Sequence, residues 1–125
     1  MEKKKIMVVD DEVDFLKIVT LNLEQTGEYE VLTLSSARDI LSRVNSFKPD
    51  LILLDVVMPG LGGIDACEIL NKDRLGKSIP IIIISALDKD KDKLKAYKRG
   101  VVDYIVKPIE KEPLIAKIEK ALQFK

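Results

Sequence analysis

The sequence of 125 residues contains no histidine and only one cysteine, Cys67. Without histidine the chain has no imidazole to act as a base, a metal ligand or a phosphate carrier, so any such group must come from another molecule. A single cysteine excludes a disulfide within the chain. Because Cys67 lies beside Ala66 in a helical pattern, we expect it to be a small core residue rather than a reactive thiol.

The chain also has no excess of either charge and no long apolar run. Lysine and arginine together number 21, as do aspartate and glutamate, so the formal net charge is zero. Such a domain has no overall field that would draw it onto DNA, RNA or an anionic membrane, and we expect no direct nucleic-acid binding by this domain. The longest apolar runs are far shorter than a membrane span, and the basic residues 3–5 lead into a short strand rather than a signal-peptide core. These features predict a cytoplasmic protein.

What is present is the composition of one globular domain, with 46% hydrophobic and 34% charged residues. Strand-like runs alternate with helix-like segments five times, which favours an α/β fold with a parallel sheet covered on both faces. The runs 6–9, 51–54 and 81–84 are continuously apolar, as is typical of central strands buried on both sides. The run 29–34 is more polar and suits an edge strand.

Apolar residues spaced by three and four predict five helices. Their buried positions are expected to be Leu16, Val19 and Leu23; Ile40, Leu41, Val44 and Phe47; Ala66, Cys67 and Leu70; Leu94 and Tyr97; and Leu114, Ile115, Ile118 and Leu122. Ser36 with Asp39 three residues later resembles a capping signal for the second helix. Gly100 suits the end of the fourth helix, and Pro113 suits the first turn of the fifth.

Four of the predicted strands end in a residue that can handle a phosphoryl group. These residues are Asp10 with Asp11, Asp55, Ser85 and Lys107, which follow the apolar runs 6–9, 51–54, 81–84 and 104–106. In an open parallel sheet the carboxyl ends of the strands lie on one edge, and ligands bind in the crevice there. We therefore expect three carboxylates, one hydroxyl and one ammonium to meet in space.

This set of groups points to phosphoryl chemistry assisted by a metal ion. Carboxylates without nitrogen or sulfur ligands favour Mg²⁺ or Mn²⁺. Once a metal screens its charge, Asp55 can attack phosphorus and form an aspartyl phosphate. Lys107 can pair with a phosphoryl oxygen, and Ser85 can donate a hydrogen bond to another. Each residue alone would be an ordinary cap, turn or surface residue, but the four features in this order are hard to explain that way.

The chain resembles the receiver domain of bacterial two-component response regulators, the CheY-like family. The segments that carry the resemblance are VVDDE (8–12), LLDVVMPG (53–60), ISA (84–86) and DYIVKP (103–108). The resemblance covers essentially the whole chain and implies a single receiver (response regulatory) domain over residues 1–125. It also implies a flavodoxin-like (βα)5 fold, a doubly wound five-stranded parallel sheet with strand order 2-1-3-4-5.

The resemblance assigns a role to each motif residue. It implies that Asp55 is the phospho-acceptor and that Asp10, Asp11, Asp55 and the backbone carbonyl of Val57 bind Mg²⁺ or Mn²⁺. It also implies that Ser85 is the switch hydroxyl and Tyr104 the switch aromatic residue. Lys107 matches the lysine of the family's site. The bond from Lys107 to Pro108 matches one that is cis in the family.

The function that the resemblance implies is a phosphorylation-dependent signalling switch. A sensor histidine kinase or histidine phosphotransfer protein would load Asp55, and the surface formed by the fourth helix, fifth strand and fifth helix would then change to control an effector domain or protein. A homodimer formed on phosphorylation is a further partner that the family allows. The domain would catalyse its own phosphorylation and dephosphorylation but would not be an enzyme acting on external substrates.

Three alternatives stay open. A haloacid-dehalogenase-type phosphatase also uses an aspartyl phosphate, but its nucleophile ends the first strand in an Asp-x-Asp pattern, and this chain has no room for a capping domain. A flavodoxin-like cofactor binder would need a phosphate-binding loop after the first strand, and no glycine-rich or Ser/Thr-rich loop is there. A degenerate receiver that only docks is disfavoured by the intact acidic trio and Lys107.

Two departures from ordinary receiver sequences concern loops beside the site. Gly62 precedes Gly63 where the family usually has an acidic or amide residue, so we expect the third helix to lack a side-chain cap. Val57 and Leu87, two residues after Asp55 and Ser85, are aliphatic and cannot orient an attacking water. We therefore expect slow loss of the phosphoryl group.

Overall fold

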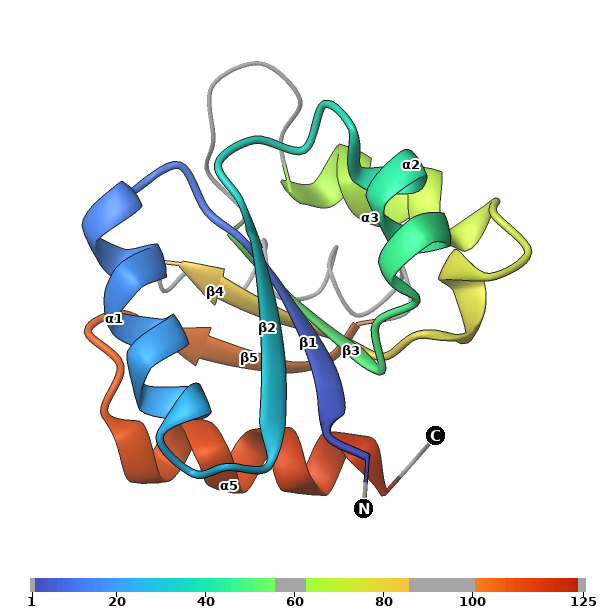
Figure 1. Ribbon diagram of the computed structural model, residues 1–125. Helices are drawn as coiled ribbons and strands as arrows, with labels where there is room; N and C mark the ends of the chain where they lie inside the picture. Colours follow the sequence, from blue (N-terminus) through green and yellow to red (C-terminus); the bar gives the residue numbers. More distant parts are fainter. Residues whose placement is uncertain (1, 56–62, 86–100, 124–125) are drawn as a thin grey trace.

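The computed structural model describes residues 2–55, 63–85 and 101–123 (Figure 1). The elements are β1 (Lys4–Val9), α1 (Val13–Glu24), β2 (Tyr29–Leu34), α2 (Ile40–Phe47), β3 (Leu51–Asp55), α3 (Gly63–Asn71), the 3-10 turn η1 (Gly76–Ser78), β4 (Ile81–Ser85), β5 (Val101–Val106) and α5 (Lys111–Leu122). The predictions for Val57, Gly62, Leu87, Leu94, Tyr97 and Gly100 lie outside the described residues.

The five strands form one parallel sheet in the order β2-β1-β3-β4-β5, which confirms the predicted topology. Every residue of β3 and β4 is buried, as the continuous apolar runs predict for central strands. The more polar β2 lies at an edge beside β1, also as predicted.

Helices cover both faces of the sheet, with α1 and α5 on one side and α2 and α3 on the other (Figure 1). Because successive side chains of a strand point to opposite faces, each strand feeds two separate cores. In β1, Ile6 and Val8 pack in the core with residues of α1 and α5. Met7 and Val9 pack in the other core with residues of α2 and α3. The alternation of strands and helices along the sequence thus produces three layers, with the sheet between two layers of helices.

The predicted buried positions of the helices are mostly correct. Leu16, Val19 and Leu23 are buried in α1, Ala66, Cys67 and Leu70 in α3, and Leu114 and Ile118 in α5, where Ala121 is buried as well without having been predicted. Cys67 is fully buried, as expected for a small core residue. In α5, Ile115 and Leu122 are only partly buried against the same core. No helix in the described ranges is long and apolar enough to cross a membrane.

Two predictions about α2 are wrong. Leu41 is 36% exposed, because it follows the buried Ile40 directly and therefore lies about 100° around the helix from the buried stripe. The expected capping pair does not form either. Ser36 Oγ accepts a hydrogen bond from the Arg38 backbone N–H at 3.3 Å, which is a local turn, and Asp39 at the N-cap makes no side-chain capping bond.

Candidate functional site

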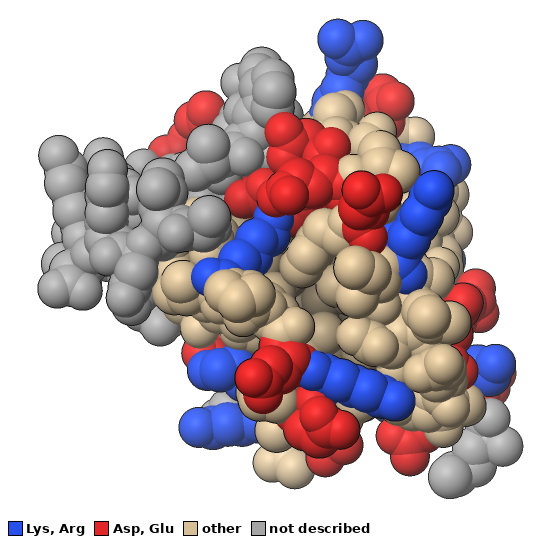
Figure 2. Space-filling view, turned by 90° about the vertical axis from the view of Figure 1, so that its left-hand side faces the viewer, with Lys and Arg blue, Asp and Glu red and all other residues tan. Residues whose placement is uncertain are grey.

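Three carboxylates meet at the carboxyl edge of the sheet. Asp10 directly follows β1 and Asp55 ends β3, and these neighbouring strands pair Val9 with Leu54. Asp10, Asp11 and Asp55 each offer an oxygen, and these oxygens lie within 4.8 Å of one another. Asp10 is 1% exposed and Asp55 5%, whereas Asp11 is exposed to solvent. The carboxyl ends of β4 and β5 point toward the face of the molecule in Figure 2, where a group of acidic side chains lies next to a basic one.

The loop after β1 is held by Asp10. Its backbone N–H donates to the Leu34 carbonyl at 3.0 Å, which continues the pairing of β1 with β2. Its Oδ1 accepts a hydrogen bond from the Glu12 backbone N–H at 2.8 Å, an Asx turn that leads into α1. Asp10 Oδ2 faces Lys107 instead. The side chain of Asp10 therefore has one oxygen fixed by its own loop and one turned into the site.

Lys107 supplies the cation of the site. It directly follows β5, its backbone N–H donates to the Ser85 carbonyl at 2.8 Å, and its bond to Pro108 is cis, as predicted. Its Nζ lies 2.8 Å from Asp10 Oδ2, 2.6 Å from Glu12 Oε1 and 4.0 Å from Asp55 Oδ2. The ammonium also lies 4.3 Å from the centre of the Phe15 ring, within range of a cation–π interaction.

The surroundings of Lys107 favour its charged form. Burial of the side chain lowers its pKa, but hydrogen bonds to Asp10 and Glu12, together with the charges of Asp10 and Asp55, outweigh burial and raise the pKa above its ordinary value. The side chain is 12% exposed. Lys107 is therefore an ammonium at any physiological pH and a permanent counter-charge for the carboxylates.

Ser85 and Tyr104 lie on β4 and β5, the two strands that follow β3 in the sheet. Ser85 ends β4 and is fully buried, and the strand register places it beside Val106 on one side, with its neighbour Ile84 beside Asp55 on the other. Tyr104 of β5 pairs with Ile83 of β4. It is 7% exposed and packs in the core that also contains residues of α2 and α3. The structure thus brings Ser85 to the same edge as Asp55 and Lys107, and holds Tyr104 in a buried position.

The donor set fits a divalent metal ion. All three carboxylates are hard oxygen ligands, two of them are buried, and their oxygens are close enough to share one ion. Asp10 Oδ2 is buried and, although ion-paired with Lys107, accepts no hydrogen bond of good geometry from the part of the chain that the structure describes. A divalent ion would give that oxygen a ligand bond in addition to its ion pair with Lys107. Val57, whose carbonyl was the fourth predicted ligand, lies outside the described residues.

Two contacts of Lys107 were not predicted from the sequence, those with Glu12 and Phe15. Glu12 belongs to the motif that follows the first strand, so its place at the carboxyl edge was predictable. The direction of its side chain was not, because a flexible carboxylate in a loop has several cations within reach.

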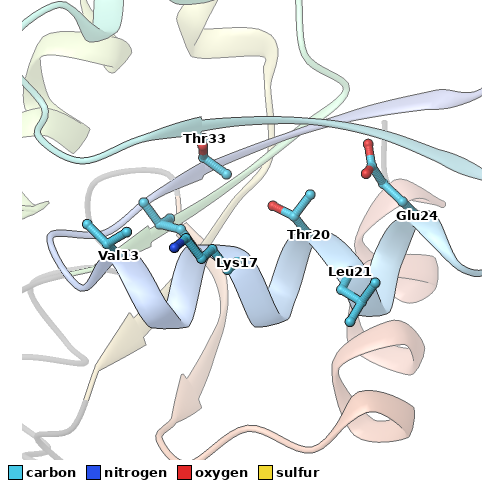
Figure 3. Close-up of a pocket in the computed structure, with 7 residues that line it drawn as sticks. Val13, Lys17, Thr20, Leu21, Glu24 and Thr33 are labelled. Atoms are coloured by element: carbon cyan, nitrogen blue, oxygen red, sulfur yellow. The ribbon is translucent and has the colours of Figure 1, made fainter.

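A separate groove runs along α1 beside the edge strand β2, with a volume of about 470 Å³ (Figure 3). It is lined by Val13, Leu16, Lys17, Thr20, Leu21, Glu24 and Thr33. Thr20 and Glu24 lie on the side of α1 that faces β2, with Thr33 opposite. None of the three clustered carboxylates lines this groove, so it is a surface feature next to the site rather than part of it.

Comparisons with known proteins agree with this geometry. The family model described as the response regulator receiver domain matches residues 6–119. The chain is 38% identical over 120 residues to the alkaline phosphatase synthesis transcriptional regulatory protein PhoP of Bacillus subtilis, covering 96% of this chain and 49% of that protein. It is 36% identical to protein PilH of Pseudomonas aeruginosa, covering 94% of this chain and 97% of PilH.

A solved structure shows the same fold. The chemotaxis protein CheY4 of Vibrio cholerae superposes with a TM-score of 0.91 at 25% identity, over 96% of this chain and 99% of that one. The family match over residues 6–119 removes two of the alternatives left open by the sequence, the haloacid-dehalogenase-type phosphatase and the flavodoxin-like cofactor binder. The chain belongs to the response regulator receiver domain family, whose members are phosphorylation-dependent signalling switches and not enzymes that turn over external substrates.

Proposed function

We propose that Asp55 is the residue that accepts the phosphoryl group. The observation that carries this assignment is the convergence of Asp55 with Asp10, Asp11 and Lys107 at one edge of the sheet. Asp55 ends the central strand β3, which lies in the sheet between β1, followed by Asp10 and Asp11, and β5, followed by Lys107, whose ammonium lies closer to Asp10 than to Asp55. The strand order therefore makes Asp55 the acid with partners on both sides.

The reaction is a transfer between two nucleophiles. A carboxylate oxygen of Asp55 attacks phosphorus in line with the donor, the new O–P bond forms, and the bond from phosphorus to the donor's imidazole nitrogen breaks. The nitrogen keeps the electron pair of that bond. The chain has no histidine, so the phosphohistidine must belong to another protein. We propose a sensor histidine kinase or a histidine phosphotransfer protein as that donor.

The charged and polar neighbours of Asp55 have separate tasks. Lys107 pairs with one phosphoryl oxygen, and the Ser85 hydroxyl donates a hydrogen bond to another. Asp10, Asp11 and Asp55, with the backbone carbonyl of Val57, would hold Mg²⁺ or Mn²⁺. The bound ion supplies charge neutralisation for the phosphoryl oxygens. We propose that Ser85 moves toward the phosphoryl group and that the rotamer of Tyr104 then changes. The change of rotamer would alter the surface around β5 and α5.

The partner that the phosphorylated domain controls is proposed from the length of the relatives and from the net charge of the chain. The chain spans about half the length of PhoP and nearly all of PilH, so receivers like this one occur both with and without a further region. We propose that the phosphorylated domain controls an effector domain or protein, or forms a homodimer, and that it acts in the cytoplasm as family members do. With a formal net charge of zero, the domain itself is not expected to bind nucleic acid.

Phosphorylation by a small donor tests this function. The protein is incubated with acetyl phosphate and Mg²⁺, and intact mass is measured. One phosphoryl group should be added to the wild type and to the control Asp65→Asn, an exposed carboxylate on α3, and none to Asp55→Asn. Full labelling of Asp55→Asn would refute the assignment, and no labelling of the wild type would indicate a degenerate receiver that only docks.

A further inference from the structure

The closest partner of the Lys107 ammonium is Glu12, a residue outside the metal cluster. Glu12 Oε1 lies 2.6 Å from Nζ, compared with 2.8 Å for Asp10 Oδ2 and 4.0 Å for Asp55 Oδ2. The lysine is therefore held at the β1 side of the site, away from the carboxylate that it must serve during phosphoryl transfer.

The backbone around Glu12 is fixed, while its side chain is accessible to water. The Glu12 N–H donates to Asp10 Oδ1 at 2.8 Å, and the Glu12 carbonyl accepts the hydrogen bond of the Leu16 N–H at 3.1 Å, at the start of α1. The Glu12 side chain is 63% exposed. The same turn carries Phe15, whose ring lies 4.3 Å from Nζ. The first turn of α1 thus presents both a carboxylate and an aromatic face to the lysine.

Exposure decides which contact of Lys107 can break. An ammonium has three N–H donors, and contacts with Asp10 and Glu12 occupy it on one side. If Lys107 left Asp10, a carboxylate 1% exposed would lose its counter-charge inside the protein, which is strongly unfavourable. If it left Glu12, water would solvate the released carboxylate at little cost. The contact with Glu12 therefore breaks more easily than the contact with Asp10.

We propose that Glu12 is a positioning residue that competes with the phosphoryl group on Asp55 for the ammonium of Lys107. The competition opposes the phosphorylated state, since the attraction to Glu12 holds the ammonium 4.0 Å from Asp55 Oδ2 and must be weakened for Lys107 to move toward the phosphoryl group. This inference rests on the proposed function of Asp55. Removing the charge of Glu12 should therefore favour the phosphorylated state by the strength of a mostly exposed ion pair, a factor of about two to five in the binding equilibrium.

Beryllofluoride, which imitates a phosphoryl group on a carboxylate, measures this equilibrium directly. Its dissociation constant is determined by calorimetry at saturating Mg²⁺ for the wild type, for Glu12→Gln and for the control Asp14→Asn, an exposed carboxylate of the same turn. Glu12→Gln should bind about two- to fivefold more tightly, and Asp14→Asn should stay close to the wild type. Equal affinity of Glu12→Gln and wild type would overturn the proposal.

A double-mutant cycle separates positioning from simple charge repulsion. In a Lys107→Met background the effect of Glu12→Gln should vanish, because Glu12 is proposed to act through the lysine. An unchanged effect in that background would mean that Glu12 only repels the anion, and would also overturn the proposal.

The ammonium signal of Lys107 in ¹H–¹⁵N spectra provides a readout without metal or analogue. Loss of the Glu12 contact should shift this signal in Glu12→Gln but not in Asp14→Asn, and an unshifted signal would contradict the contact. If the wild type binds no beryllofluoride at all, the proposed function fails together with this inference. If it binds but Glu12→Gln changes nothing, only the inference fails.

Discussion

Replacing Asp55 with asparagine should stabilise the protein in the absence of divalent metal. Asp55 is buried, and among the charged groups whose distances are given above it has the carboxylates of Asp10 and Asp11 within 4.8 Å and the Lys107 ammonium at 4.0 Å. The substitution keeps the shape of the side chain and removes only its charge. The contribution of these three charges therefore depends on whether the repulsions by Asp10 and Asp11 exceed the attraction to Lys107.

The distances give the magnitude. With an effective dielectric constant of about 20, a repulsion at 4.8 Å is worth about 3.5 kcal/mol and the attraction at 4.0 Å about 4 kcal/mol. The two repulsions thus exceed the attraction by about 3 kcal/mol. Solvent around the exposed Asp11 screens part of its repulsion with Asp55, so the expected stabilisation of Asp55→Asn is about 1–2 kcal/mol.

Urea unfolding at neutral pH with a metal chelator measures the change in unfolding free energy. The control is Glu30→Gln, an exposed carboxylate on the edge strand, which should change stability by less than about 0.5 kcal/mol. Added Mg²⁺ should stabilise the wild type more than Asp55→Asn, because the ion removes the same repulsion. A destabilised Asp55→Asn under chelation would refute this electrostatic account of the cluster.

Three further predictions concern the core, the lysine and the phosphoryl lifetime. Leu53→Ala, at a fully buried position, should lower the unfolding free energy by about 2–5 kcal/mol in urea unfolding, whereas Leu21→Ala, 58% exposed, should change it by under about 1 kcal/mol. Because the pKa of Lys107 is raised in the folded state, its stabilising ion pairs persist below its ordinary value of 10.5 and are lost as the pH rises through the higher folded value. Between neutral pH and about 10.5 the stability difference between wild type and Lys107→Met should therefore stay constant and shrink only at higher pH, and a decline between neutral pH and about 10.5 would contradict this. Replacing Val57 with Asn and Leu87 with Glu, both outside the described residues, should speed loss of the phosphoryl group by supplying groups that can orient a water, and unchanged or slower decay would count against this expectation.

The sequence predicted the sheet well because burial dictates its strands. The runs 51–54 and 81–84 are apolar at every position, a pattern typical of strands covered on both faces, and both became central strands. The same reasoning placed Asp10, Asp55, Ser85 and Lys107 at one edge, because parallel strands share the direction of their ends.

The errors have local physical causes. Leu41 was assigned to the core because it is apolar, but the phase of α2 is fixed by Ile40 and Val44, and Leu41 falls outside their stripe. The contact between Glu12 and Lys107 joins residues 95 positions apart and depends on the rotamers of two long side chains. Neither periodicity nor strand order determines such rotamers.

The central claim is that Asp55 carries the phosphoryl group, and reductive trapping tests it most directly. The protein is phosphorylated with acetyl phosphate and Mg²⁺ and treated with borohydride, which converts an aspartyl phosphate into homoserine. The digested peptides are then sequenced by mass spectrometry. The account predicts homoserine at position 55 and unmodified aspartate at Asp10 and Asp11. Homoserine at either of those two positions, with Asp55 intact, would contradict it.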